Sequence, residues 1–173
     1  SFAPDLNPLK YHGTKRKFLS KTNKTITYIT SYGLLLRDLK ILSEVKWDVM
    51  ILDEAHYIKN YKTVTYKAAC QIESSFRLCL TGTPMENSLG ELKNLFDFLV
   101  PGYLGSKSFF NKEFIIPIIK NNDVEKEHLL QKLIYPLKMR RTKKSVLSEL
   151  PKKIEDIRYC ELSKEQAFLY QKV

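Results

Sequence analysis

The sequence has little cysteine, and what it has is badly spaced for cross-linking or metal binding. Its 173 residues include three cysteines, Cys70, Cys79 and Cys160, with no Cys-x-x-Cys pair and no histidine close by in sequence. An odd count at such spacings predicts neither a disulfide framework nor a zinc knuckle. Because disulfide-poor chains are typical of reducing compartments, we expect an intracellular protein.

Long apolar runs are also missing. No stretch approaches the roughly 18 consecutive apolar residues of a membrane span, and residues 1–20 lack the basic-then-apolar order of a signal peptide. We therefore expect a soluble chain with no membrane partner. With 43% hydrophobic residues and only six glycines, it is long enough to bury a core of its own.

Charge of one sign is in excess. The formal net charge is +10, and most of the excess falls in two clusters. Clustered cations suit a polyanionic partner such as a nucleic acid, but charge runs also occur as solvated surface. Charge alone leaves both interpretations open for the basic residues, which are Lys10, Lys15, Arg16, Lys17, Lys21 and Lys24 in the first cluster and Lys138, Arg140, Arg141, Lys143 and Lys144 in the second.

The hydrophobic pattern predicts an α/β fold. Short strands are expected at 9–12, 25–32, 49–52 and 76–80, with a turn at Gly33 and helices at 34–44, 63–73 and 88–99. The continuous apolar run at 49–52 is typical of a strand covered on both faces, as in a parallel sheet. Strand, helix and strand between 49 and 80 make a βαβ unit, whose two strands run parallel.

The later part of the sequence reads as helical. Helices are expected at 106–120, 123–135 and 142–149, with interruptions at Pro117 and Pro136. An exposed strand is expected over 152–162, followed by a helix capped by Ser163. We therefore expect three parts: an α/β part at 1–100, a helical extension at 101–150 and a connecting segment at 151–173.

Polar residues follow two of the predicted parallel strands. Asp53 and Glu54 come after the strand at 49–52, and Thr81-Gly82-Thr83 follows the strand at 76–80. Ligands of open α/β sheets bind beyond the carboxyl ends of the strands, so both clusters are expected at one edge. Asp53 is placed to hold magnesium, directly or through water. Glu54 is a candidate to orient or deprotonate an attacking water.

His56 is a candidate link between the two clusters. Its ring can donate or accept hydrogen bonds, which suits contact with the loop at 81–83. Taken alone, His56 also has a second interpretation, an ordinary surface or helix-start histidine. Thr81, Gly82 and Thr83 taken alone are an ordinary strand-end turn. Two polar motifs at corresponding strand ends point to function more strongly than either does separately.

Several segments together resemble a known family. They are "ITSYGLLLRD", "WDVMILDEAHYIKN", "RLCLTGTPMENSLGELKNLFDFLVPGYLG", "MRRTKKSVLSELPKKIE" and "YCELSKEQ". In this order they resemble the Swi/Snf family of DNA-dependent ATPases, within the superfamily-two helicase class. The resemblance runs from about Phe2 to the end of the chain, and it is specific because of the ordered series, since "DEAH" alone is common.

The resemblance implies a partial RecA-like, P-loop NTPase-type parallel sheet with flanking helices and a helical appendage. Residues 1–100 would be the C-terminal part of the first RecA-like lobe, and residues 151–173 the start of the connection to the second. ATP and Mg²⁺ would be the cofactors. Catalytic roles fall on Asp53, Glu54 and His56, with Asp53 as the Walker B magnesium residue. Thr81, Gly82 and Thr83 would couple nucleotide state to DNA.

Double-stranded DNA is the partner that the resemblance implies, with a DNA-bound protein as a further target. Localisation would then be the cytoplasm or nucleoid of a bacterium, or the nucleus of a eukaryote. Contacts to the DNA backbone would be salt-sensitive and largely independent of sequence. The residues expected to make them are Thr30, Ser31, Tyr32, Lys15, Arg16, Arg140, Arg141 and Lys143.

One motif of the family is absent from the 173 residues. No Gly-x-x-x-x-Gly-Lys-Ser/Thr phosphate loop occurs, and the resemblance places that loop upstream of this segment. We therefore expect a fragment that hydrolyses no ATP by itself, although its parent would be a DNA translocase. Two alternatives stay open: a non-catalytic DNA-binding or protein-interaction module with the same fold, and a helicase that separates strands.

Overall fold

The computed structural model describes residues 6, 8–18, 25–82, 88–141, 156 and 162–170. The chain divides into two compact units, residues 1–132 and residues 133–173. Each is considered by itself. The expected division into 1–100, 101–150 and 151–173 remains a prediction.

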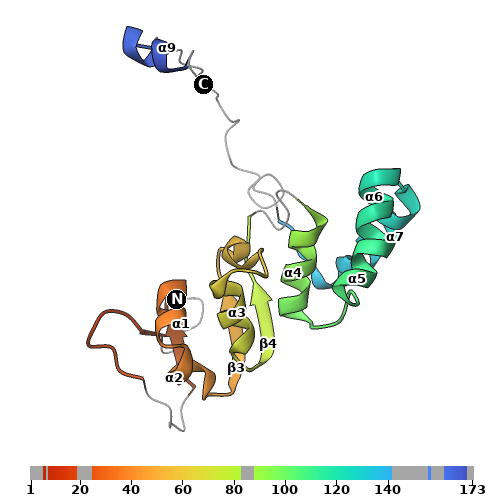
Figure 1. Cartoon of the computed structure of the whole chain (residues 1–173). Helices are drawn as coiled ribbons and strands as arrows, with labels where there is room; N and C mark the ends of the chain where they lie inside the picture. The colour runs from red at the N-terminus through yellow and green to blue at the C-terminus, as the bar shows by residue number, and fades with distance from the viewer. Residues whose placement is uncertain are drawn as a thin grey trace. The chain divides into compact units, whose positions relative to one another are not determined.

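A parallel strand pair forms the centre of the first unit (Figure 1). Strand β3 (Trp47–Leu52) and strand β4 (Ser74–Cys79) pair in parallel, with Val49 opposite Phe76 and Ile51 opposite Leu78. Helix α3 (Val64–Gln71) lies between them in sequence. The predicted βαβ unit is therefore confirmed. Because β-branched and aliphatic residues fit a pleated surface, the runs "VMIL" and "FRLC" form strands.

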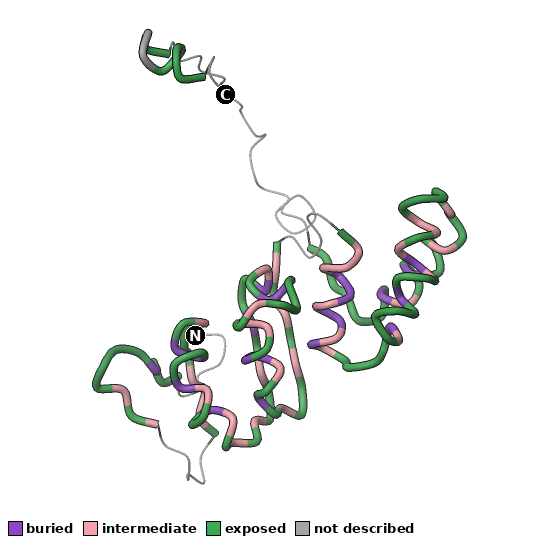
Figure 2. Tube along the Cα trace, in the orientation of Figure 1, coloured by how far each residue is buried: buried purple, intermediate pink, exposed green. Residues whose placement is uncertain are grey.

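Helices cover one face of this strand pair. A single core cluster joins Leu52 and Ala55 to buried residues of helices α1 (Tyr32–Arg37), α2 (Leu39–Ser43), α3 and α4 (Leu89–Leu99). Buried positions accordingly lie along the helices in Figure 2. The side chains of this cluster are mostly small or aliphatic. Their removal from water is the main contribution to the stability of the fold.

The opposite face of the pair is uncovered within the described part of the chain. Side chains alternate between faces along a strand, and Val49 and Ile51 are 51% and 56% exposed. The prediction that this strand is covered on both faces is therefore wrong for the described residues. Phe76 and Leu78 on β4 share that exposure, as does Leu80 just after the strand.

The start of α1 differs from the prediction. Ser31 has extended backbone angles, and its hydroxyl accepts a hydrogen bond from the Leu34 backbone N–H. This cap draws Tyr32 and Gly33 into the helix, so the predicted strand end and turn at these residues are wrong. The predicted single helix at 34–44 is interrupted at Asp38, which ends α1 and precedes α2.

A second, smaller parallel pair precedes this region. Strand β1 (Pro8–Lys10) pairs with strand β2 (Thr27–Ile29), so both predicted strands exist but are shorter than expected. Aromatic rings pack beside it: Phe18 lies 5.0 Å from Tyr28 and 5.9 Å from Trp47, measured between ring centroids. Such ring clusters bury large apolar area and connect this pair to the start of β3.

Arg77 on β4 fastens two helices to the strand pair. Its guanidinium donates to the carbonyl oxygens of Phe98 at 2.8 Å and Ile72 at 2.9 Å. Those carbonyls belong to the ends of α4 and α3, where backbone acceptors lack partners within the helix. A cation at this point therefore satisfies both helix ends, and it also lies 4.8 Å from the centroid of the Phe98 ring.

The later helices agree with the sequence pattern. Helix α5 (Lys107–Phe110), the π-type turn η2 (Asn111–Ile115) and helix α6 (Ile116–Asn121) follow one another without a break, and α7 (Val124–Ile134) is followed by η3 (Tyr135–Leu137). The predicted helices at 106–120 and 123–135 are confirmed, but the chain stays helical through Pro117, where an interruption was expected. Helix α9 (Lys164–Tyr170) begins after Ser163, whose hydroxyl accepts from the Gln166 N–H.

The predicted helix at 142–149 lies outside the described residues, as does the predicted strand at 152–162 apart from Asp156 and Leu162. Within the described ranges, the structure contains no helix with the length and apolar content needed to cross a membrane.

Candidate functional site

An acidic loop follows the carboxyl end of β3. Glu54 adopts left-handed backbone angles, φ 48° and ψ 50°, which cost a residue with a Cβ about 1–2 kcal/mol. The Asp53 carboxylate accepts a hydrogen bond of 2.9 Å from the Glu54 N–H. A backbone held in such a conformation needs support from its surroundings.

Hydrogen bonds from three directions supply that support. The Ala55 N–H donates to the Leu80 carbonyl oxygen at 2.9 Å, and the Tyr57 N–H donates to the Glu54 carbonyl oxygen at 3.2 Å. The Tyr32 hydroxyl donates to the Asp53 carbonyl oxygen at 2.8 Å. The short helix η1 (Ala55–Ile58) anchors the loop through Ala55 and Ile58, which are both fully buried. The loop backbone is therefore fixed.

The side chains on this fixed loop remain accessible. The Glu54 and His56 side chains are 64% and 38% exposed, and the Glu54 Oε2 atom lies 3.2 Å from His56 Nδ1. Asp53 is exposed as well. A carboxylate pair on a rigid backbone, open to solvent and beside an imidazole, can accept a ligand without rearranging the chain.

The two predicted polar clusters lie at one edge of the strand pair. The Leu80 N–H donates to the Leu52 carbonyl oxygen at 2.8 Å, and Leu80 in turn accepts from Ala55. Thr81, the next residue, is half-buried and Gly82 is exposed. Thr83 lies outside the described residues. The predicted contact between His56 and the loop at 81–83 remains a prediction.

Asp53 and Glu54 do not form a closed metal cage. Across the described ranges, no group of three or more histidine, cysteine, aspartate or glutamate side chains is arranged to hold a metal ion. Magnesium, however, is commonly bound by one or two carboxylates together with waters and substrate phosphates. The exposed Asp53 fits that kind of site, in which most of the ligands arrive with the substrate.

The first residue of α1, Tyr32, is hydrogen-bonded directly to the acidic loop. Ser31 and Thr30 are exposed, and the Thr30 hydroxyl donates to the Tyr11 carbonyl oxygen at 3.1 Å. Burial raises the pKa of Tyr32 to about 12, with smaller contributions from Cys79, Asp53 and Glu54. Its hydroxyl is therefore protonated at neutral pH and remains a donor to Asp53. Tyr32 thus connects the start of α1 to the loop that carries Glu54.

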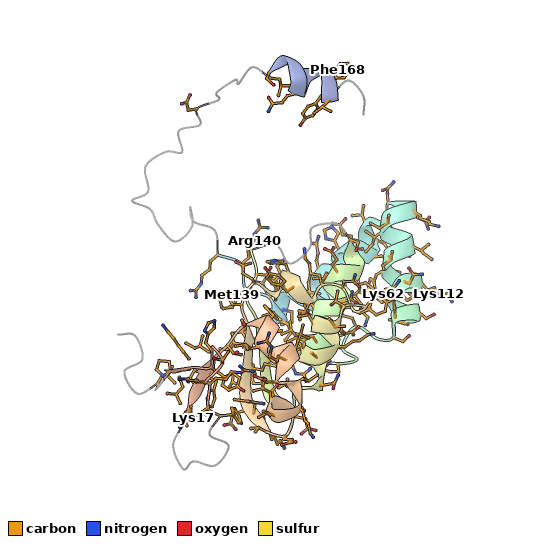
Figure 3. The ribbon with its side chains drawn as sticks, turned by 60° about the vertical axis from the view of Figure 1, so that its left-hand side comes forward. Lys17, Lys62, Lys112, Met139, Arg140 and Phe168 are labelled. Carbon is orange, nitrogen blue, oxygen red and sulfur yellow. The ribbon has the colours of Figure 1, made fainter. Side chains whose placement is uncertain are left out.

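The predicted basic residues are placed in different ways. Lys15 is exposed, but Arg16 donates two hydrogen bonds to the Asp38 carboxylate, at 2.5 and 2.7 Å. The side chains of this pair are only 14% and 9% exposed. In the second unit, Arg140 and Arg141 are exposed, and Figure 3 labels Arg140. Lys143 lies outside the described residues.

The described cysteines are poor nucleophiles. Burial raises the pKa of the Cys79 thiol to about 12 and also raises that of Cys70. Because the thiolate is the reactive form, neither side chain suits covalent catalysis at neutral pH. Cys160 lies outside the described residues.

Two features near the loop have no clear signal in the sequence. The Asn94 side chain donates to the Lys59 carbonyl oxygen at 2.7 Å, which ties the end of η1 to α4. The Lys59 ammonium lies 3.7 Å from the Glu91 carboxylate and is almost fully buried.

The second feature is the Tyr57 ring, which lies beside His56 with ring centroids 4.3 Å apart. An aromatic residue next to "DEAH" was the only sequence hint for it.

Comparison with known proteins gives a consistent family assignment. The model of the SNF2-related domain matches residues 1–173. The putative ATP-dependent helicase/translocase YwqA of Bacillus subtilis is 40% identical over 179 residues, which cover 100% of this chain and 19% of that protein. The TATA-binding protein-associated factor MOT1 of Saccharomyces cerevisiae is 38% identical, covering 98% of this chain and 10% of its own length.

Solved structures agree. The SWI2/SNF2 ATPase core of Sulfolobus solfataricus in complex with dsDNA superposes with a TM-score of 0.72 at 41% identity, covering 98% of this chain and 36% of that one. The same core solved as the ATPase core domain gives a TM-score of 0.67 at 40% identity. The predicted RecA-like α/β fold and the Swi/Snf resemblance are therefore confirmed. This chain spans a fifth or less of the two relatives named above.

Proposed function

Because this chain belongs to the SNF2-related domain family, we propose that it is the Walker B and coupling part of an ATP-dependent translocase on double-stranded DNA. The observation that carries the proposal is the acidic loop after β3. Its backbone is fixed by hydrogen bonds to Leu80 and Tyr32, while the Asp53 and Glu54 side chains face solvent. A fixed backbone with accessible carboxylates suits a site that binds a ligand from solution.

Asp53 is the proposed magnesium residue. When bound with ATP, the metal would neutralise phosphate charge. Glu54 is proposed to orient or deprotonate the attacking water. Its Oε2 atom lies 3.2 Å from His56 Nδ1, which supports that role because the contact favours some carboxylate orientations over others. The phosphate-binding loop that ATP also requires has no counterpart in these 173 residues. The isolated chain is therefore expected to be inactive.

DNA is proposed to lie along the start of α1. Thr30 and Ser31 are exposed there, and Tyr32 joins this segment to Asp53. The protein in the superposed Sulfolobus complex is bound to dsDNA, which supports the same partner here. Lys15, Arg140 and Arg141 remain proposed phosphate contacts, with Lys143. Thr81, Gly82 and Thr83 remain the proposed coupling loop, with His56 facing it.

Arg16 is not kept among the proposed DNA contacts. Its guanidinium is paired with Asp38 through two short hydrogen bonds and is largely covered. Breaking a covered ion pair to reach a phosphate would leave the Asp38 carboxylate without its cation, which is unfavourable. We infer that Arg16 has a structural role.

The test of this function is the Glu54→Gln variant of the full-length protein. We expect it to bind ATP as the wild type does and to lose DNA-stimulated hydrolysis by about 10²- to 10⁴-fold, the range of general acid–base contributions. Glu44→Gln, an exposed glutamate at the end of α2, is the matched control. Unchanged turnover in Glu54→Gln would refute the assigned role. An inactive wild type that still binds duplex DNA would favour the non-catalytic module.

A DNA-bound protein is the proposed target of the translocation. The relatives that are TATA-binding protein-associated factors support this target. The relative that is a putative ATP-dependent helicase/translocase supports the translocation itself. Strand-separation assays distinguish this activity from that of a helicase which unwinds the duplex.

A further inference from the structure

The Tyr57 ring is exposed but contacts two other rings. It is 57% exposed, so burial alone does little to fix the orientation of its side chain. Here its centroid lies 4.3 Å from that of His56, with planes 31° apart, and 5.1 Å from that of Tyr32, with planes 41° apart. Ring pairs at such separations attract one another beyond the area that they bury.

These contacts connect the start of α1 to Glu54 by two routes. One is the hydrogen bond from the Tyr32 hydroxyl to the Asp53 carbonyl oxygen. The other runs through side chains: Tyr32 contacts Tyr57, Tyr57 contacts His56, and His56 Nδ1 lies 3.2 Å from Glu54 Oε2. The second route reaches the carboxylate itself, whereas the first fixes only the backbone before it.

Among the described residues, His56 has few restraints beyond its contacts with Glu54 and Tyr57. Its side chain is 38% exposed, and the Glu54 side chain is 64% exposed, so solvent alone would leave both free to change rotamer. The Tyr57 ring covers one side of the imidazole. Removing it would leave the imidazole and the carboxylate with more accessible orientations, which weakens pre-organisation of a reacting group.

We propose that Tyr57 is a positioning residue: in contact with the rings of both Tyr32 and His56, it holds the imidazole beside Glu54 and so transmits the state of the DNA-facing segment to that carboxylate. The proposal rests on the proposed function, since it assigns to the same site a residue that acts through His56. Tyr57 is not expected to touch ATP.

Steady-state kinetics of the full-length protein test this role. We expect Tyr57→Leu to lower kcat at saturating DNA by about tenfold, within the range that small misplacements produce, while the KM for ATP and the half-saturating DNA concentration stay unchanged. Tyr57→Phe keeps the ring and should retain wild-type kcat. Tyr61→Leu is the matched control, because Tyr61 is a nearby exposed tyrosine whose ring contacts Lys107 instead.

Different outcomes overturn the proposal in recognisable ways. A raised half-saturating DNA concentration with unchanged kcat would make Tyr57 a direct DNA contact. Equal loss in the Leu and Phe variants would assign the effect to the hydroxyl. Wild-type kinetics in Tyr57→Leu, alongside an inactive Glu54→Gln, would refute the positioning role while leaving the proposed function intact.

A second readout does not depend on turnover. An aromatic ring next to His56 shifts the NMR resonances of the imidazole protons. In ¹³C-histidine-labelled protein, the signals that disappear in His56→Gln are those of His56. We expect Tyr57→Leu to move them and Tyr57→Phe to leave them nearly in place. Unmoved His56 resonances in Tyr57→Leu would overturn the proposal even if the protein proved to have no ATPase activity.

Discussion

The Tyr32 hydroxyl donates a 2.8 Å hydrogen bond to the backbone carbonyl oxygen of Asp53. The bond spans 21 residues of sequence and joins the first turn of α1 to the loop after β3. Asp53 directly precedes Glu54, the proposed catalytic carboxylate. The bond therefore links the segment proposed to lie on DNA to the loop that carries Glu54. Movement of either segment must therefore be accommodated by the other.

Tyr32→Phe removes this bond and keeps the ring. A hydrogen bond of this kind contributes about 1 kcal/mol to stability, so we expect the melting temperature of the 173-residue chain to fall by about 2–4 °C. Thermal unfolding followed by circular dichroism measures it. An unchanged melting temperature would mean that water replaces the hydroxyl without loss.

Asp38 is expected to make stability depend on pH. The hydrogen bonds from Arg16 lower the pKa of Asp38 below its ordinary value, so the folded chain binds this proton more weakly than the unfolded chain. The stabilisation is complete above the unfolded pKa of about 4 and is lost as the pH falls through the lower folded value. Asp38→Asn should melt at a lower temperature at pH 7 and lose less stability on acidification.

The pair of Lys126 and Glu113 is the control for that experiment. It also lowers the pKa of Glu113, but both side chains are 34% exposed, so solvent screens the pair. Glu113→Gln should therefore change the acid dependence less than Asp38→Asn. Equal effects would contradict the view that the covered pair matters more.

Gly105 is expected to tolerate alanine less well than Gly102. Both have positive φ, +73° and +81°, but a Cβ on Gly105 would lie 2.6 Å from a Phe109 ring carbon, whereas one on Gly102 would meet nothing within 4 Å. Gly102→Ala should cost about 1–2 kcal/mol from the left-handed backbone alone. Gly105→Ala should cost more, measured by chemical denaturation. Phe109→Ala should remove the excess in a double-mutant cycle, and equal costs for both glycines would refute the steric argument.

Arg140 and Arg141 are expected to contact DNA phosphates. Each lost contact lowers the slope of log Kd against log salt by about 0.9, so the double alanine variant of the full-length protein should lose about 2 from that slope. Lys120→Ala, which removes an exposed lysine of α6, is the control. A slope equal to that of the wild type would exclude both arginines from the DNA contacts.

Much of the fold follows from local pattern. The apolar run at 49–52 predicted β3, and the hydrophobic pattern over 88–99 predicted α4, because each depends on neighbouring residues. The boundary at Tyr32 was missed because the Ser31 cap starts α1 there. The break at Asp38 was missed because its carboxylate pairs with Arg16, 22 residues away in sequence. Periodicity carries no signal for such contacts.

The sequence predicted some features of the candidate site and not others. Sequence order placed Asp53 and Glu54 at a strand end, and parallel pairing brought Leu80 beside them. The left-handed angles of Glu54 and the stack of Tyr57 between Tyr32 and His56 depend on three-dimensional packing. The exposure of Val49 and Ile51 was missed because an apolar run shows only that both faces of a strand are suited to burial. In the described part of the chain, helices cover only one of those faces.

The most direct measurement is the ATPase rate of the full-length protein with and without duplex DNA. We predict a rate that rises on adding duplex DNA, that is lost in Glu54→Gln but not in Glu44→Gln, and that is absent from the isolated 173-residue chain. A full-length rate that duplex DNA leaves unchanged, or that survives in Glu54→Gln, would refute the proposed function.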